Sequence, residues 1–344
     1  MSKIKFFIFF VVSITLAVVG WFANSFAEPF AAAQSVESPA KGLYIFAYRG
    51  DYGFDDFLAE GGAPSADKMA EYITSFLTRG LVSTSPRPND FGCSVMSVDN
   101  EHGGHIMARN FDWEKEVDSD IVVVHTYPTN GYASVATSYV DFLGFGEDYA
   151  PRSLMDKMAL LAAIYVPLDG MNEAGLSVAD LIVGDGEMID QQSARADLTI
   201  TAAIRLLLDK AATVEEALAL LSQYDIHSDI GQAHHLAIAD KSGHEVVVEW
   251  VANKMIVTES PVCTNHYLAY SGSQVVAGNS LERYAALRSM LDDNKTMSVE
   301  QATKSIECVV APSTRWTAIF DSHAMEVTYY QRGDFQRPYI ATIK

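Results

Sequence analysis

Short runs that either alternate hydrophobic and polar residues or are rich in β-branched residues dominate the chain after residue 92. Most of them are rich in β-branched residues and are bounded by Gly, Asn or Pro, a pattern typical of β-strands. The runs before residue 252 are predicted to form one antiparallel sheet, and three further runs close the chain. The predicted strands span residues 93–98, 105–109, 120–127, 132–140, 175–183, 235–240, 244–251, 315–321, 324–331 and 338–343.

Other stretches carry apolar residues at the helical period. Two of them begin with the spacing of a capping box, Thr213 with Glu216 and Ser298 with Gln301. Strands come first, helices fall mostly in the middle and strands come last, so the sequence predicts an α+β fold with helices packed on sheet faces. The predicted helices span residues 66–80, 152–166, 194–211, 213–224, 279–293 and 298–310.

The N-terminus has the pattern of a secretory signal. Lys3 and Lys5 precede an uncharged run from Phe6 to Phe22, and small residues around Ser25 and Ala27 suit a cleavage site. We expect residues 1–27 to be removed and the protein to be exported to the periplasm, the medium or another extracytoplasmic compartment. The alternative is an uncleaved membrane anchor, because the apolar run falls at the short end of what can span a bilayer.

The charge of the chain excludes one class of partner. The 344 residues include 24 Lys and Arg against 44 Asp and Glu, which gives a formal net charge of −20. Such an acidic surface repels phosphate backbones, so nucleic acid is not an expected partner.

Cysteine usage leaves an unpaired thiol. An exported protein normally pairs its cysteines, but Cys93, Cys263 and Cys308 make an odd number. Counting alone does not decide whether Cys263 and Cys308 form a disulfide or whether all three are small buried apolar residues.

Several weak motifs are better explained without chemistry. His102 and His105 flank a Gly-Gly pair typical of a polar hairpin tip, and His234 and His235 point to opposite faces of any strand. The acidic stretch 184–188 lacks further calcium ligands at the required spacing, and Gly-rich phosphate loops do not occur in the sequence. We therefore expect neither a metal nor an organic cofactor.

The segment GCSVMSVDNEHGGHIMARNFDW, residues 92–113, carries the main candidate for chemistry. A cysteine attacks as a thiolate and needs a nearby base or positive charge. If the strand 93–98 pairs with 105–109 in a hairpin, Arg109 returns to the level of Cys93 and Asp112 lies just beyond. The alternative is a buried hairpin with a surface Arg-Asp pair.

The glycine before Cys93 suggests another group that could act as the base for the thiol, the α-amine of Cys93 itself. Cleavage of the Gly92–Cys93 bond would give Cys93 a free α-amine, whose ordinary pKa of about 7.7–8.0 suits a general base near neutral pH. Asp112 is the natural partner to hold that amine. The Pro- and Ser-rich stretch 83–92 is expected to be an exposed linker that ends at the cysteine.

This segment resembles the N-terminal-nucleophile hydrolases of the choloylglycine hydrolase and penicillin V acylase group, with the related acid ceramidase and acyl-CoA:6-aminopenicillanate acyltransferase families. Their mature chains begin with Cys, and an Arg-x-x-Asp-Trp motif follows at this spacing. Three further stretches agree in order. They are DGMNEAGLSVADL at 169–181, VCTNHY at 262–267 and GNSLERY at 278–284.

The resemblance implies a role for six residues. Cys93 would be the nucleophile and its amine the base, and Arg109 and Asp112 would position and polarise it. Further along the chain, Asn265 and Asn172 would form the oxyanion hole, and Arg283 would complete the charged network. The implied fold is a four-layer αββα sandwich.

The segment ahead of the cysteine resembles one branch of this group. About 65 residues separate the signal from Cys93, as in the acid ceramidase and acyltransferase branches, whose precursors cut themselves into two chains that stay associated. We therefore expect residues 28–92 to be a propeptide or a small subunit, the latter retained after cleavage, and residues 93–344 to be the catalytic domain. Arg-Asn-Phe-Asp also fits these branches better than the bile-salt enzymes.

Together these features predict a self-processing enzyme that hydrolyses a linear, non-peptide amide through a thioester on Cys93, with an apolar acyl group in the substrate. N-acyl amino acids, acyl-homoserine lactones, penicillin V and N-acylethanolamines all remain candidate substrates, because a pocket discriminates acyl chains by only about 1–3 kcal/mol per methylene. An acyltransferase with the same site is one alternative. A non-catalytic exported binding protein with an uncut Cys93 is the other.

Overall fold

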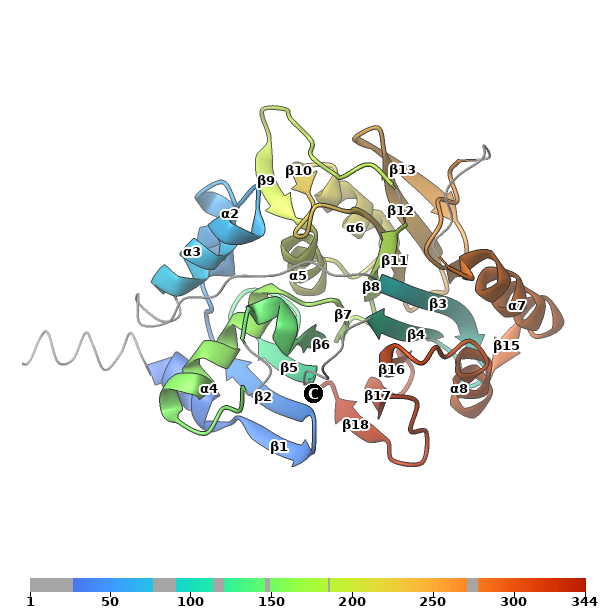
Figure 1. The fold of residues 1–344 in the computed structure, drawn as a ribbon, viewed down its shortest axis with the longest axis horizontal. Coiled ribbons are helices and arrows are strands. Elements are labelled where there is room, and N and C mark those ends of the chain that lie inside the picture. The colour runs from blue at the N-terminus through green and yellow to red at the C-terminus, as the bar shows by residue number, and fades with distance from the viewer. Residues whose placement is uncertain (1–26, 77–90, 114–120, 146–148, 185, 271–277) are drawn as a thin grey trace, which may run out of the picture.

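Two β-sheets packed face to face form the centre of the molecule (Figure 1). The computed structural model describes residues 27–76, 91–113, 121–145, 149–184, 186–270 and 278–344. The predicted signal or anchor, except for its last residue Ala27, and most of the predicted linker lie outside these residues. Within the described ranges, no helix is long and apolar enough to cross a membrane.

The larger sheet has nine strands among the described residues. All neighbouring pairs are antiparallel except β2 and β5, which run parallel. In order across the sheet the strands are β1 (Glu37–Ala40), β2 (Leu43–Arg49), β5 (Ile121–Tyr127), β6 (Ser134–Tyr139), β7 (Asp169–Asn172), β8 (Ser177–Val183), β11 (Ala233–Ala239), β12 (Glu245–Val251) and β13 (Lys254–Glu259).

The second sheet is built around a central hairpin. It contains, in order, β14 (Val262–Cys263), β3 (Phe91–Asn100), β4 (His105–Trp113), β16 (Thr314–Asp321), β17 (Glu326–Gln331) and β18 (Tyr339–Thr342), with β15 (Thr296–Met297) also paired to β3. The central hairpin is formed by β3 and β4. Outside both sheets, β9 (Ala196–Thr199) and β10 (Tyr224–His227) form a separate parallel pair.

Helices cover the outer face of each sheet and complete four layers (Figure 1). The larger sheet packs against α2 (Phe54–Ala59), α3 (Ala66–Phe76), α4 (Leu154–Leu160), α5 (Ile200–Lys210) and α6 (Val214–Leu221), with the 3-10 turns η1 (Val140–Leu143) and η2 (Leu161–Tyr165). The second sheet packs against α7 (Ser280–Asp293) and α8 (Val299–Glu307). This arrangement is the αββα sandwich that the resemblance implied.

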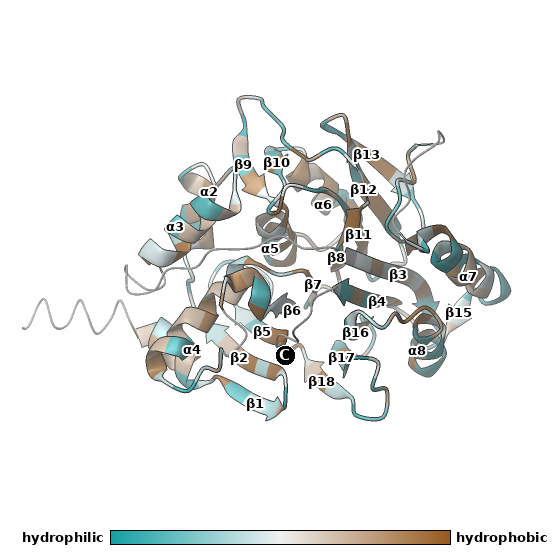
Figure 2. Cartoon of the chain, viewed as in Figure 1, coloured by the Kyte–Doolittle hydropathy of each residue, from teal (hydrophilic) through white to brown (hydrophobic). Residues whose placement is uncertain are grey.

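Both faces of the central strands are buried, which explains their nearly continuous hydrophobic sequence. In β5, Val122 and Val124 face the helices, whereas Ile121 and Val123 face the second sheet. Figure 2 shows the hydrophobic colour along β11 and β12 and mostly hydrophilic colour on the peripheral loops. The layer between the sheets also contains Cys93, so the candidate nucleophile lies inside the sandwich.

The structure corrects three predictions. The strands do not form one antiparallel sheet, because β3 and β4 belong to one sheet and β5 and β6 to the other. The predicted helix over 194–211 starts only at Ile200, and β9 takes up its first part. Thr213 caps α6 as expected, but the Glu216 carboxylate accepts from the Ala212 N–H instead of closing the box, whereas the Ser298–Gln301 box is complete.

Candidate active site

Cys93 is buried at the start of the β3–β4 hairpin. The strand begins at Phe91, two residues earlier than predicted, so the Gly92–Cys93 bond lies within β3. Arg109 pairs with Val95 and not with Cys93, which pairs with Phe111. Positions two apart in a strand share a face, and Arg109 Nη2 accordingly lies 3.8 Å from Cys93 Sγ.

Arg109 is held in place by groups from the opposite sheet. It is fully buried, and Nη1 donates to the carboxylate of Asp169 on β7. Nη2 donates to the backbone carbonyl of Asp180 on β8 at 2.6 Å. Trp316 on β16 donates from Nε1 to the same Asp169 oxygen at 2.9 Å. These bonds fix the guanidinium beside the sulfur and compensate its charge in the interior.

A second buried group surrounds the backbone of Cys93. The Cys93 N–H donates to Asn265 Oδ1 at 2.7 Å, and Arg283 Nη2 donates to the same oxygen at 2.8 Å. Arg283 Nη1 donates to the Cys93 carbonyl and, at 2.6 Å, to Ser94 Oγ. Asn265 Nδ2 donates to the Ile182 carbonyl at 2.7 Å, which leaves its second hydrogen free of any partner among the described residues.

Local structure explains how these two side chains reach Cys93. Asn265 follows β14, whose Cys263 pairs with Val95 on β3. Arg283 lies in the first turn of α7, where its Nε donates to Asn279 Oδ1 at 2.8 Å. The short strand and the helix start therefore place Asn265 and Arg283 against the same end of β3.

Asp112 lies beside the Gly92–Cys93 bond. It pairs with Gly92 across the hairpin, and a Cβ on Gly92 would lie only 3.2 Å from Asp112 Oδ2. Thr314 donates to Asp112 Oδ1 at 2.5 Å. Burial raises the pKa of Asp112 to about 6, although this hydrogen bond and the charges of Arg283 and Arg109 act to lower it.

The thiol of Cys93 is protonated in this environment. Burial raises its pKa to about 11, while the charge of Arg109 opposes the shift. A thiol with this pKa supplies little thiolate near neutral pH, so attack requires a base that removes its proton.

The side chain of Asn172, for which the resemblance implied an oxyanion role, lies outside this group. Its Nδ2 donates to the carbonyls of Leu208 and Ala211 at the end of α5, and its Oδ1 accepts from the backbone of the turn after β7. Asp169 and Met171 on the same strand face the layer between the sheets. Strand alternation therefore turns Asn172 toward the helices.

A cavity opens beside the thiol, with an empty volume of about 320 Å³ when the open solvent at its mouth is included. Its wall is largely apolar but includes His234, which sequence reasoning had dismissed. His234 Nδ1 lies 2.9 Å from Asp180 Oδ1, and Nε2 lies 3.0 Å from Ser228 Oγ. The lining residues are Cys93, Phe111, Phe142, Leu168, Asp180, Ile182, Thr201, Asp229, Ile230 and His234.

The sequence contained one usable signal for the residues that were missed. Asp169, Asp180 and His234 are polar residues inside strands whose neighbours are almost all apolar. A charged residue at a buried strand position requires a charged or hydrogen-bonding partner. That rule indicates that Asp169, Asp180 and His234 need partners, but it does not show that Arg109 is the partner.

Two other histidines from the sequence analysis, His235 and His105, have structural roles. His234 and His235 do face opposite sides, since His235 pairs with Glu249 and not with Asp180. His105 is buried between Asp99 and Glu245 and is therefore not part of an exposed hairpin tip.

The cysteines do not form a disulfide. Cys93, Cys263 and Cys308 are all free, with Cys263 buried and Cys308 exposed. The open possibility of a bond between Cys263 and Cys308 is therefore not realised.

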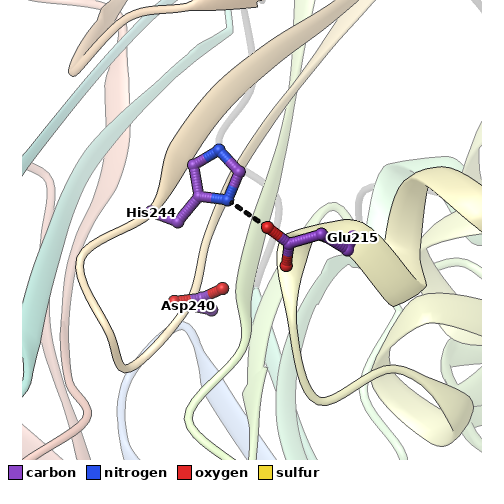
Figure 3. A group of neighbouring side chains, drawn as sticks. All are labelled: Glu215, Asp240 and His244. Carbon is purple, nitrogen blue, oxygen red and sulfur yellow. Dashed lines mark hydrogen bonds and ion pairs between the residues drawn. The ribbon is translucent and has the colours of Figure 1, made fainter.

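One group of side chains in the described residues has the composition of a metal site. Glu215, Asp240 and His244 place ligand atoms within 4.8 Å of one another (Figure 3). His244 Nδ1 lies 2.9 Å from Glu215, and Asp240 accepts from the N–H groups of Ser242 and Val214. These bonds hold the β11–β12 turn against the start of α6, and we assign the group that structural role.

Comparison with known proteins agrees with this geometry. Residues 93–308 match the family model of linear amide C–N hydrolases, choloylglycine hydrolase family. The solved penicillin V acylase from Agrobacterium tumefaciens is similar at 20% identity with a TM-score of 0.50, over 72% of this chain and 84% of that one.

A mutant conjugated bile acid hydrolase from Clostridium perfringens gives 15% identity and a TM-score of 0.51, over 73% of this chain and 92% of that one. At these identities the likeness shows the fold. A search of curated proteins gives no match. The family match spans more than half of the chain, so the protein belongs to the choloylglycine hydrolase family of linear amide C–N hydrolases.

Proposed function

We propose that the protein is a self-processing cysteine amidohydrolase in which Cys93 becomes the N-terminal residue of the catalytic chain. The observation that carries the proposal is the hydrogen bonding of the Cys93 backbone nitrogen. That nitrogen donates to Asn265 Oδ1, which Arg283 also contacts, while Arg109 lies on the sulfur of the same residue. Nucleophile and future base therefore already have separate polar partners.

Self-processing starts with addition of the Cys93 sulfur to the carbonyl carbon of Gly92. The Gly92–Cys93 C–N bond then breaks, and the thiol proton ends on the nitrogen, which becomes a free α-amine. This leaves a thioester between Gly92 and Sγ. Water hydrolyses the thioester, which gives a carboxylate on Gly92 and restores the thiol. Asp112, next to this bond and with a pKa of about 6, is placed to exchange protons during these steps.

Turnover uses the same groups. The new α-amine takes the thiol proton, and the thiolate attacks the carbonyl carbon of the substrate amide. Asn265 has one Nδ2 hydrogen available to stabilise the oxyanion. As the intermediate collapses, the C–N bond breaks and the Cys93 ammonium protonates the leaving amine. Water, deprotonated by the amine, then hydrolyses the acyl thioester.

The substrate has an apolar acyl group in this proposal. The cavity beside Cys93 is walled by Phe111, Phe142, Leu168 and Ile182, which suit a hydrocarbon chain. The family supports a small-molecule linear amide as the class of substrate. N-acyl amino acids, acyl-homoserine lactones, penicillin V and N-acylethanolamines make up the panel to test.

The proposal includes retention of the segment before Cys93. Strand β2 pairs with β5 along its whole length, and the Tyr52 hydroxyl donates to both carboxylate oxygens of Asp209 at 2.6 and 2.7 Å. Ala63 N–H donates to the Asp197 carbonyl at 2.9 Å. Cutting one bond at Gly92 removes none of these contacts, so the two chains would stay together. Export through the N-terminal signal remains a further part of the proposal.

The test is a search for the acyl-enzyme. Purified wild-type protein is mixed with each amide and quenched in acid, and its intact mass is measured by mass spectrometry. Cys93→Ala is the matched control. We expect an added acyl mass on the fragment that begins at Cys93, together with release of amine and acid. Absence of both adduct and hydrolysis in a cut wild-type enzyme, for every amide, would contradict hydrolysis of these amides.

A competing amine separates the hydrolase from an acyltransferase. When hydroxylamine or a second primary amine is added, a hydrolase releases mainly the carboxylic acid. A new amide as the main product, at amine concentrations far below that of water, would assign the protein to the acyltransferases instead.

A further inference from the structure

Two cavities of the molecule meet behind Cys93. The first is the cavity that contains the thiol, and the second has an empty volume of about 380 Å³ when the open solvent at its mouth is included. Three residues, Phe142, Thr201 and Asp229, line both cavities. A chain that starts at the sulfur and fills the first cavity therefore reaches the second at this junction.

The far wall of the second cavity comes from the segment before the proposed cleavage site. Helix α3 presents an apolar face there, and its Tyr72 hydroxyl donates to the Gly53 carbonyl at 2.7 Å, which ties the helix to α2. The residues that line the second cavity are Ala66, Met69, Ala70, Ile73, Phe142, Leu143, Ala162, Val166, Thr201 and Asp229.

Asp229 is the one carboxylate at the junction of these two linings. It accepts from the Thr201 N–H at 2.9 Å and from Thr201 Oγ1 at 2.8 Å, one bond on each oxygen. Burial raises the pKa of Asp229, although the hydrogen bonds from Thr201 and Thr199 and the charge of His234 act to lower it. A carboxylate offers about four acceptor positions, so at least one remains for a donor in the cavity.

We propose that the acyl group of the substrate runs from Cys93 past Asp229 into the second cavity, and that it is an aliphatic chain with a hydroxyl group that donates to Asp229. This inference rests on the proposed function and deepens it by naming the acyl class. The apolar walls suit the chain, and the partly buried carboxylate offers an acceptor to a hydroxyl group at the junction.

The first experiment measures chain length. Ala70→Phe fills the second cavity from α3, and Ser75→Phe places the same side chain on the exposed face of that helix as a matched control. We expect Ala70→Phe to lower kcat/KM for dodecanoyl amides by about 100-fold and to leave acetyl and butanoyl amides within about threefold. Equal loss for all lengths, or none, would overturn this path.

The second experiment measures the hydroxyl group. Wild type is compared on dodecanoyl amides with and without a hydroxyl at successive chain positions. We expect one position to raise kcat/KM by about 10- to 100-fold, the range of a hydrogen bond to a charged group. Asp229→Leu should abolish the preference, and Asp229→Asn, which keeps the size and one acceptor, should retain part of it. A preference unchanged in Asp229→Leu, or none in wild type, would contradict the assignment.

Failure of this inference differs from failure of the proposed function. If wild type neither cuts itself nor hydrolyses any amide, the function itself is wrong. If wild type hydrolyses short amides and Ala70→Phe and Asp229→Leu behave like wild type with every chain, the function stands and the acyl path is wrong.

Discussion

Cys93 lies between two buried arginines that contact different atoms of the same residue. Arg109 is on its sulfur and Arg283 on its carbonyl oxygen. The sequence predicted the first of these contacts from hairpin pairing. The predicted pairing of Cys93 with Arg109 was wrong by two residues, because Cys93 pairs with Phe111. The predicted contact between the two side chains still forms, because a shift of two residues keeps a side chain on the same face of the strand.

Loss of the Arg109 charge should be costly for both activity and stability. Arg109→Gln leaves Asp169 buried without its cation, and breaking a buried ion pair in this way costs about 3–5 kcal/mol. We expect kcat/KM to fall by about 100-fold or more, a fall larger than the unfolded fraction explains. Urea unfolding and amide hydrolysis measured on the same preparation check both parts. Arg109→Gln with wild-type kcat/KM would contradict the assignment.

Asp112 should give the uncut protein a distinct pH dependence. Its pKa in the folded state, about 6, exceeds the ordinary value of 3.8. The folded protein therefore prefers protonated Asp112, and this contribution is present below about pH 4 and lost as the pH rises through about 6. One pKa unit corresponds to about 1.4 kcal/mol, so about 3 kcal/mol is at stake.

The measurement uses Cys93→Ala, which keeps the chain uncut. Its unfolding free energy is compared with that of Cys93→Ala/Asp112→Asn between about pH 4 and pH 7. The double variant should lack the fall in stability that the single variant shows as the pH rises. Parallel curves would show that Asp112 does not titrate in this range.

At the scale of single elements, β7 shows what a sequence motif leaves undecided. Asp169 and Asn172 belong to one stretch that resembles a family motif, but strand alternation sends them to different layers. Asp169 supports Arg109, whereas Asn172 joins the end of α5 to the turn after β7. No strand was predicted here, because the predicted strand began only at Gly175, and so alternation could not separate the two side chains.

Asn172 and Asn265 should therefore differ when each is replaced by alanine. Asn172→Ala leaves the Leu208 and Ala211 carbonyls without their donor and should destabilise by about 2–4 kcal/mol. Its kcat/KM per folded molecule should stay within about threefold of wild type. Asn265→Ala should instead lower kcat/KM by about 100-fold or more. Equal loss of activity in both would restore an oxyanion role for Asn172.

The whole molecule depends on residues far apart in sequence. The period of each run predicted most strands and helices, and therefore the α+β class. The division into two sheets could not be predicted from these periods. The strands of both sheets are hydrophobic on two faces, so their hydrophobic pattern does not show which strands are neighbours. The four-layer order came from the resemblance alone.

The segment before Cys93 should stay bound after cleavage. It supplies β1, β2, α2 and α3, and Tyr52 anchors it to Asp209 on α5. The two fragments should co-elute on native size exclusion and separate only in denaturant. Tyr52→Phe, which removes a hydrogen bond to a buried carboxylate, should lower stability by about 1–3 kcal/mol without releasing the segment. Elution of the large fragment alone would contradict retention.

The most direct test of self-processing is the intact mass and N-terminal sequence of the purified protein, measured beside Cys93→Ala. We expect a wild-type fragment that begins at Cys93 and a variant that remains whole. A single uncut chain in both proteins, after prolonged incubation from acidic to neutral pH, would contradict the N-terminal-nucleophile mechanism.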